Sequence, residues 1–374
     1  MISKKLRILA VFSDVNFSPQ LIAILQKLND CGAEIRVVLI GNTELEIAKQ
    51  IRLRGWDSQI IAQRGKYGSV LNLLLLSLEI IKFRPQTLFA SGQFATILGM
   101  LSAKILNVPH RVFIRHHSIL HHKYNMKLGL VIDHTSNRLA TNIVAVSMVV
   151  KNILIEYESV NQNKIILIHN GVDLSEFKSK QHLPKEPSTR TIVNSRVFHI
   201  GVISRLTQWK GVEYVAKAFV RLQEEFPNSL LHIVGAFSDS YTNVKNILSA
   251  ADSNRYVLEP SNCNIPLFLH GLDAFVHVPV GIDDEAFGIV YIEALASRIP
   301  CVFTRSGVLN ELESPELFAH LVAYRNSEEI YMNLARLIQG MHDSKIAVPE
   351  SWLNQFSLEK MTNDYAKLLL RESL

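Results

Sequence analysis

The chain has 374 residues, 48% of them hydrophobic and 20% charged, which is ordinary for a folded α/β protein and long enough for two domains. Its three cysteines have neither disulfide nor metal-ligand spacing, which argues against a disulfide scaffold and favours a reducing cytosol. Residues 1–190 carry 24 Lys and Arg against 13 Asp and Glu, and residues 191–374 carry 15 against 21, so the first half is expected to face an anionic partner.

Neither apolar stretch of the first half predicts a membrane anchor. The run Arg7–Phe12 follows a basic flank but is short, so it predicts a buried strand rather than a signal peptide. The run Val70–Ile81 is interrupted by polar residues and is too short to cross a bilayer. We therefore expect a cytoplasmic protein, with peripheral attachment to the anionic inner face of the cytoplasmic membrane through its basic first half. Dispersed solvated charge is the alternative, and the sequence shows no nucleic-acid-binding motif.

Short apolar, β-branched runs alternate with helix-length segments along the first half. The predicted strands are Arg7–Phe12, Glu34–Ile40, Thr87–Ala90, His110–Ile114, Asn142–Val146 and Ile165–Ile168, with helices such as Pro19–Leu28 and Ala95–Leu106 between them. This alternation predicts a parallel sheet covered on both faces.

Three segments at predicted strand ends carry polar residues. His116 and His117 end one strand, and either could face a ligand, although paired histidines at such a place are more often structural. Ser147 is the expected N-cap of a following helix. The turn from Asn170 to Asp173 follows the last strand, and its Gly171 can take a positive φ near a hinge.

The second half repeats the pattern after a polar linker, residues 178–196. Its predicted strands are Phe198–Ile203, Leu230–Val234, Ala274–Val278, Pro300–Phe303 and Phe318–Val322, and a closing helix spans Trp352–Leu370. We therefore expect an N-terminal domain over residues 1–177, a second domain over residues 197–350, and a C-terminal segment, residues 351–374, that returns to the first domain.

Two loops of the second half carry charges suited to a nucleotide diphosphate. Arg205 and Lys210 lie between a strand end and a helix, where they could neutralise phosphate oxygens. Glu285 precedes a helix expected to begin at about Gly288, and Glu293 lies a turn and a half into it. The N-terminus of that helix suits a diphosphate, and the carboxylates could bind sugar and ribose hydroxyls. An acidic first turn with one exposed glutamate explains this second loop equally well.

In their order along nearly the whole chain, these segments resemble glycosyltransferase family 4, the retaining enzymes also called glycosyl transferases group 1. The matching motifs are Glu285-x7-Glu293 with Phe287-Gly288 inside it, Ser204-Arg205-Leu206-x3-Lys210-Gly211, the turn Asn170-Gly171-Val172-Asp173, and the closing helix after Phe356. The resemblance implies the GT-B fold, an α/β architecture of two Rossmann-like parallel-sheet domains facing across a cleft, with a C-terminal helix that crosses back to the first domain.

The resemblance also implies roles for individual residues. The donor diphosphate would be held by Arg205, Lys210, Phe287, Gly288 and Ile289, and the ribose by Glu293. The sugar would be bound by Glu285 and by one of His116 and His117, of which His116 is preferred. The hinge would be formed by Asn170, Gly171 and Asp173. The reaction would move a sugar from a UDP-sugar, or a GDP-sugar, to a saccharide or lipid-linked saccharide of a lipopolysaccharide, capsule or other cell-surface polymer. The resemblance implies no cofactor and no metal ion.

The chain departs from the family in its first loop. Many relatives have two glycines there, whereas this chain has Asp14 and Asn16, which would shape the acceptor side. Three other classes of protein remain as alternatives. A related sugar-nucleotide epimerase would turn over the donor without an acceptor, and a binding protein would be non-catalytic. An NAD-dependent dehydrogenase is disfavoured, because the first loop lacks a glycine-rich fingerprint.

Overall fold

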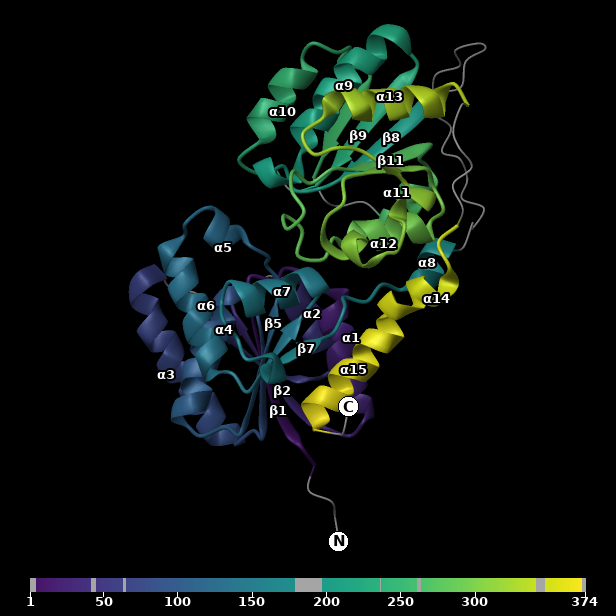
Figure 1. Cartoon of the computed structure of the whole chain (residues 1–374). Coiled ribbons are helices and arrows are strands. Elements are labelled where there is room, and N and C mark those ends of the chain that lie inside the picture. The colour runs from purple at the N-terminus through teal and green to yellow at the C-terminus, as the bar shows by residue number, and fades with distance from the viewer. Residues whose placement is uncertain are drawn as a thin grey trace. The chain divides into compact units, whose positions relative to one another are not determined.

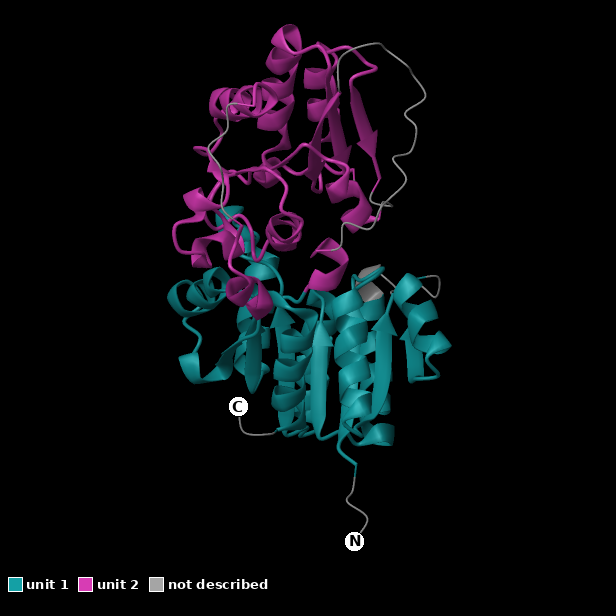
Figure 2. Cartoon of the chain, turned by 90° about the vertical axis from the view of Figure 1, so that its right-hand side faces the viewer, with its two compact units in different colours: residues 1–171, 356–374 teal, residues 172–355 magenta. Residues whose placement is uncertain are grey.

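The computed structural model describes residues 5–41, 45–62, 65–178, 197–235, 237–260, 264–340 and 347–371. It divides the chain into two compact units, unit 1 with residues 1–171 and 356–374, and unit 2 with residues 172–355 (Figure 2). Each unit is built on one parallel sheet, so the predicted α/β architecture of two Rossmann-like domains is confirmed. The predicted linker, residues 178–196, lies outside the described residues except for Lys178, which ends a helix.

Unit 1 has seven strands in the order β3-β2-β1-β4-β5-β6-β7. The strands are β1 (Arg7–Ser13), β2 (Glu34–Ile40), β3 (Asp57–Ile61), β4 (Thr87–Ser91), β5 (His110–Arg115), β6 (Asn142–Ala145) and β7 (Ile165–Leu167). The helices are α1 (Pro19–Asp30), α2 (Glu46–Leu53), α3 (Gly65–Phe83), α4 (Gln93–Ile105), α5 (Leu120–Lys123), α6 (Lys127–Leu139), α7 (Met148–Glu156) and α15 (Leu358–Leu370). Helix α4 packs against both α3 and α6 on one face of the sheet, and α1 packs against α15 on the other (Figure 1).

The central strands of unit 1 are almost wholly apolar and buried, as expected for a parallel sheet with helices on both faces. Phe12 of β1 and Phe89 of β4 meet edge to face with ring centroids 5.9 Å apart. The ring of Tyr365, on α15, lies 5.8 Å from that of Phe89. Helix α15 therefore completes the core of unit 1, although it lies at the end of the chain.

Unit 2 has six parallel strands in the order β10-β9-β8-β11-β12-β13. The strands are β8 (Phe198–Ile203), β9 (Ser229–Val234), β10 (Tyr256–Glu259), β11 (Ala274–His277), β12 (Cys301–Phe303) and β13 (His320–Leu321). The helices are α8 (Leu174–Lys178), α9 (Val212–Glu225), α10 (Tyr241–Leu248), α11 (Ile265–His270), α12 (Ile289–Ala296), α13 (Ser327–Ile338) and α14 (Glu350–Leu353). A buried hydrophobic cluster fills the space between the sheet and helices α9 and α13.

The structure corrects three predictions about the elements. Strands β3 and β10 were not predicted, because β3 alternates exposed polar positions with less exposed ones and the apolar run of β10 is only three residues long. The closing helix is not continuous, since α14 ends at Leu353 and α15 starts after its N-cap Ser357. Helix α8 groups with unit 2, where it packs on α12, so the division falls at Gly171 rather than at residue 177.

Candidate active site

The carboxyl edge of the sheet in unit 2 brings together the two charged loops that the sequence predicted. The strand order reverses at β8, with β9 on one side and β11 on the other, and ligands of open α/β sheets bind at such a point. The loop after β8 contains Arg205 and Lys210, and the loop after β11 contains Glu285. The two loops are joined where the Val280 N–H donates to the Trp209 carbonyl at 3.0 Å.

Glu285 is the centre of a buried polar group. Its Oε1 accepts a hydrogen bond from the Lys210 ammonium, which forms an ion pair with it, and His277 Nε2 lies 2.9 Å from the same oxygen. Because an ionised carboxylate only accepts, His277 carries its proton on Nε2 and donates. Within the described part of the chain, only Oε1 of this carboxylate is bonded, so Oε2 can accept a hydrogen bond from a ligand hydroxyl.

The electrostatics fix the charges in this group. Burial by itself would raise the pKa of Glu285, but the Lys210 charge and the His277 hydrogen bond outweigh it and lower the pKa to about 2. Burial lowers the pKa of His277 despite its bond to Glu285. At neutral pH Glu285 is therefore a carboxylate and His277 a neutral imidazole.

The Glu285 loop is held in place by residues that lie outside the predicted motifs. The Glu285 N–H donates to Ser306 Oγ at 3.2 Å, and the Ser306 hydroxyl donates to the Gly281 carbonyl at 2.9 Å. Thr304 Oγ1 donates to the Pro279 carbonyl at 2.7 Å. These hydroxyls directly follow β12, and His277 ends β11. Their one signal in the sequence was that they are polar residues at the ends of apolar strands.

Helix α12 begins where the sequence predicted, with Gly288 as its N-cap at φ 79°. A β-carbon at Gly288 would lie 2.6 Å from the Tyr291 ring, so the position requires glycine for both its backbone conformation and its space. Phe287 is buried, and Ile289 starts the helix. The first N–H groups of α12 thus directly follow the loop that carries Glu285.

Glu293 and Arg205 are less constrained than Glu285. Glu293 is partly buried on α12, and burial raises the pKa of its carboxyl to about 7. Arg205 is exposed, and its guanidinium has no hydrogen-bond or ion-pair partner among the described residues. An exposed guanidinium in the loop that also carries Lys210 leaves positive charge available to an anionic ligand.

In unit 1, the two predicted histidines have different environments. His116 is exposed after β5, and its Nε2 lies 3.0 Å from Ser91 Oγ at the end of β4. His117 is partly buried, and its Nε2 lies 3.2 Å from Asp133 Oδ1. Both histidines line a cavity of about 50 Å³ that is also bordered by Gln93 and Thr96 of α4.

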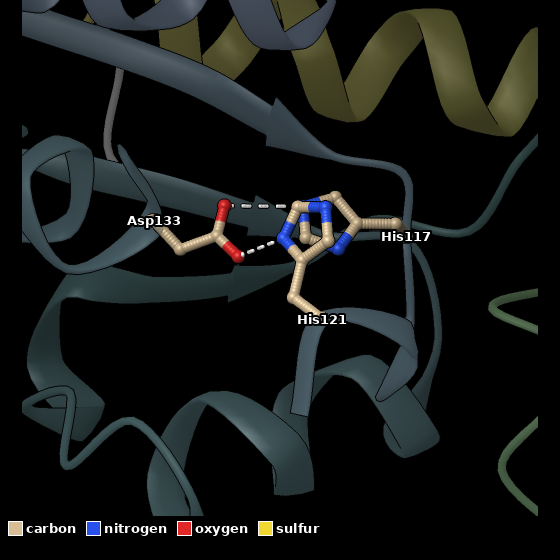
Figure 3. Close-up of side chains that lie close together, drawn as sticks. All are labelled: His117, His121 and Asp133. Atoms are coloured by element: carbon tan, nitrogen blue, oxygen red, sulfur yellow. Dashed lines mark hydrogen bonds and ion pairs between the residues drawn. The ribbon is translucent and has the colours of Figure 1, made fainter. Parts of the chain in front are cut away.

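His117 belongs to a buried charged cluster (Figure 3). His121 Nδ1 lies 2.6 Å from Asp133 Oδ2, and the Arg115 guanidinium lies 3.0 Å from Asp133 Oδ1. Arg115 also pairs with Glu158. Burial would raise the pKa of Asp133, but the His117 hydrogen bond and the Arg115 charge outweigh it and lower the pKa.

The atoms of His117, His121 and Asp133 that could bind a metal lie within 4.8 Å of one another, and two imidazoles with a carboxylate are a familiar ligand set. The Arg115 guanidinium, however, already neutralises that carboxylate and would lie beside a bound cation. We therefore interpret the cluster as a hydrogen-bonded clamp that fixes His117 and the end of β5.

The first loop of unit 1 contains the two residues predicted for the acceptor side. Asp14 has a left-handed backbone (φ 58°) directly after β1, and its Oδ2 accepts a hydrogen bond from Ser13 Oγ at 2.9 Å. The Asn16 side chain accepts from the Glu46 N–H at 3.3 Å. Asn16 thus supplies a capping oxygen to α2, whose own N-cap Leu45 has none.

The predicted hinge residues have local structural roles. Gly171 does not have the positive φ expected of it. It is glycine because α15 passes close by, where an added β-carbon would lie 2.7 Å from Leu358 Cα. Asp173 Oδ1 accepts the Ser175 N–H at 3.1 Å, at the start of α8. Asn170 lies beside Gly171 and is partly buried.

Two family models match the chain. The model described as Glycosyltransferase Family 4 matches residues 21–176, and the model described as Glycosyl transferases group 1 matches residues 190–345. Together they cover most of both units.

Two curated relatives match a shorter stretch. An uncharacterised glycosyltransferase of Methanocaldococcus jannaschii is 26% identical over 184 residues, which are 47% of this chain and 44% of the relative. The alpha-monoglucosyldiacylglycerol synthase of Acholeplasma laidlawii is 20% identical over 193 residues, 47% of this chain and 48% of the synthase. The matched stretch thus spans less than half of each curated relative.

Solved structures also resemble the chain over almost its full length, and Anabaena HepE is one of them. Anabaena HepE, in complex with UDP and glucose, has a TM-score of 0.80 and 19% sequence identity, and the match covers 98% of this chain and 100% of HepE. This likeness establishes the shared fold.

Proposed function

Because the chain belongs to glycosyltransferase family 4, we propose that it transfers a sugar from a nucleoside diphosphate sugar, with retention of anomeric configuration, to a saccharide or lipid-linked saccharide. We propose a UDP-sugar as the first donor to test, since HepE was solved with UDP and glucose. A GDP-sugar is the second.

One observation supports the donor site above all others, the buried group of Lys210, Glu285 and His277 at the point where the strand order of unit 2 reverses. A buried carboxylate that keeps one oxygen open suits the hydroxyls of a sugar. The ammonium beside it, the exposed Arg205 and the N-terminus of α12 suit a diphosphate.

In the proposed reaction, the bond from the anomeric carbon to the β-phosphate oxygen breaks while negative charge grows on the departing diphosphate. Lys210, Arg205 and the first N–H groups of α12 stabilise that charge. The acceptor hydroxyl attacks from the same face, and the leaving phosphate accepts its proton, so no enzymic nucleophile takes part. We propose that this charge stabilisation needs no metal ion.

We propose that His116 contacts the donor sugar and that His117 has a structural role in the cluster at the end of β5. His116 is exposed at a strand end beside the cavity, whereas Asp133 holds the Nε2 of His117. Glu293 is assigned to the ribose, and the loop of Asp14 to the acceptor. We place the enzyme in the cytoplasm, at the inner face of the membrane, with a role in cell-surface polymer synthesis. Within the described residues, no helix is both long and apolar enough to cross a membrane.

The proposal is tested by measuring binding and slow hydrolysis of a panel of UDP- and GDP-sugars, with and without a chelator. Glu285→Ala is measured alongside, and Glu224→Ala, which alters an exposed glutamate of α9, is the matched control. We expect one donor to bind and to be hydrolysed in the presence of chelator, with loss of turnover in Glu285→Ala only.

Other outcomes reject parts of the proposal. Absence of binding across the panel contradicts a nucleoside diphosphate donor. Conversion of the donor to an epimer without an acceptor indicates the epimerase class. Donor binding with no turnover, under conditions where acceptors are supplied, indicates a non-catalytic binding protein.

A further inference from the structure

Helix α3 of unit 1 exposes a continuous stripe of aliphatic side chains. The stripe consists of Val70, Leu71, Leu74, Leu75, Leu78 and Ile81. Its members recur at steps of three and four residues, so they lie on one side of the helix. They are between 37% and 66% exposed, and single exposed leucines are common whereas such a row is not.

Helix α3 buries two of its polar residues while its exposed side is aliphatic, which is unusual for a surface helix. Asn72 and Glu79 face inward and are 1% and 7% exposed. Glu79 pairs with Arg36 at 3.2 Å, and Ser77 Oγ donates to Ser102 Oγ of α4 at 3.2 Å. An ordinary amphipathic helix buries its leucines and exposes its polar residues. The inner side of α3 thus combines buried polar residues with buried apolar ones such as Leu76 and Ile80, and its exposed aliphatic side has no partner among the described residues.

The same helical layer exposes further aliphatic residues. Ile105 ends α4, which packs against α3, and it is 67% exposed. Leu128 and Val131 are exposed on α6, which packs on the other side of α4. Exposed aliphatic side chains therefore occur on three neighbouring helices that cover one face of the sheet (Figure 1).

All the exposed charge on this layer is positive. From residue 65 to residue 139 the chain contains two acidic residues, Glu79 and Asp133, and both are buried in ion pairs. The exposed charged side chains on or next to helices α3, α4 and α6 include Lys82, Arg84, Lys104, Lys127 and Arg138. Apolar side chains flanked by lysine and arginine are what an anionic bilayer surface attracts.

We propose that α3 is a membrane-docking helix that inserts its aliphatic stripe between the headgroups of anionic lipids, with the surrounding basic side chains on the lipid phosphates. A second copy of the chain fits less well. A two-fold interface would place the same positive charges against each other, whereas anionic lipid neutralises them.

The inference deepens the peripheral attachment put forward under the proposed function by naming its surface and by adding an apolar contribution. Helices α4 and α6 also carry residues of the histidine cavity, including Thr96 and Ser136. Docking through this layer would therefore hold the acceptor side of unit 1 near lipid-linked saccharides.

The test measures sedimentation of the full chain with vesicles of phosphatidylcholine alone or with phosphatidylglycerol, at low salt and at about 1 M salt. The stripe variant is Leu74→Gln with Leu78→Gln. The matched control is Leu267→Gln with Leu317→Gln, which alters two leucines of unit 2 with similar exposure. No donor is present, so a failure here is separate from a failure of the transferase proposal.

We expect the wild-type chain to bind vesicles that contain phosphatidylglycerol. The stripe variant should bind at least about 10-fold more weakly, since two leucines no longer enter the lipid, while its melting temperature and the binding of the control stay unchanged. Binding to anionic vesicles should weaken but persist at high salt. Wild-type binding that the stripe variant retains, or no binding at low salt, overturns the proposal. A wild-type dimer that the stripe variant converts to monomer also overturns it, and identifies a second copy as the partner.

Discussion

Lys210 and Glu285 form a buried ion pair although 75 residues separate them in the chain. The pair links the loop after β8 to the loop after β11, and the same carboxylate oxygen also binds His277. In the proposed function, Lys210 supplies positive charge to the diphosphate of the donor, and Glu285 balances that charge when no ligand is bound. This pair leads to two predictions.

Lys210→Ala should lower the turnover number by on the order of 10²-fold, since it removes a charge that stabilises the departing diphosphate. It should also lower the free energy of unfolding by about 3–5 kcal/mol, because Glu285 is left buried without its partner. Single-turnover assays and denaturant unfolding measure the two effects. Lys217→Ala, at an exposed position on α9, is the control, and normal turnover in Lys210→Ala would contradict the assignment.

Glu285→Gln should make the stability of the protein less dependent on pH in the acidic range. The pKa of Glu285 is lowered to about 2, below the value of an unfolded glutamate, so its contribution is complete above about pH 4.5 and is lost as pH falls toward 2. The variant should therefore be destabilised most near pH 7, and the gap to wild type should shrink below about pH 4.5. Melting temperatures across this range test the prediction, and a gap that stays constant with pH would contradict it.

The sequence predicted the fold from its alternation of apolar runs and helical segments, and the strands that it missed carry weak signals. Strand β3 alternates exposed polar positions with less exposed ones, as an edge strand can, and the apolar run of β10 is only three residues long. An apolar run is the signal of a central parallel strand. The break before α15 was also missed, because Ser357 interrupts a continuous helical pattern with an N-cap.

The sequence predicted Glu285 and Lys210 as separate site residues, but it did not predict that they form an ion pair. Spacing along the chain does not say which loops the sheet order brings together, and the reversal at β8 decides that. His277 and Ser306 were missed for the same reason, since their hydrogen bonds to Glu285 exist only in the folded chain. The raised pKa of Glu293 depends on the burial of its carboxyl, and the helical periodicity of the sequence did not predict that burial.

Glu293→Gln should weaken donor binding and stabilise the protein at high pH. The pKa of Glu293 is raised to about 7 by burial, so ionisation in the folded state costs free energy as pH rises from about 4.5 to 7. The amide avoids this cost, so the variant should gain melting temperature at pH 8 but not at pH 4. Its donor dissociation constant should rise at pH 8, where wild type offers a carboxylate to the ribose. Glu224→Gln, which changes an exposed glutamate, should do neither, and unchanged donor binding in Glu293→Gln would remove Glu293 from the site.

His116→Ala and His117→Ala should separate the roles of the two histidines. Loss of His116 should lower the turnover number with little change in melting temperature, because among the described residues its ring is hydrogen-bonded only to Ser91. Loss of His117 should lower the melting temperature, because the buried carboxylate of Asp133 loses one of its hydrogen-bond partners. Calorimetry and sugar-transfer assays on both variants decide the assignment, and the opposite pattern would exchange the two roles.

Gly171→Ala should destabilise the packing of α15 on unit 1. The added methyl would lie 2.7 Å from Leu358 Cα and 2.9 Å from Met361 Cβ, so the helix must shift, at a cost of about 1–3 kcal/mol of unfolding free energy. Gly271→Ala is the matched control, because its methyl would meet its nearest atom at 3.4 Å, an ordinary contact, and its φ of −83° suits alanine. Denaturant unfolding of both variants makes the comparison. Equal stability of the two would show that α15 can move away from Gly171 without loss, and that the close approach does not hold the end of the chain on unit 1.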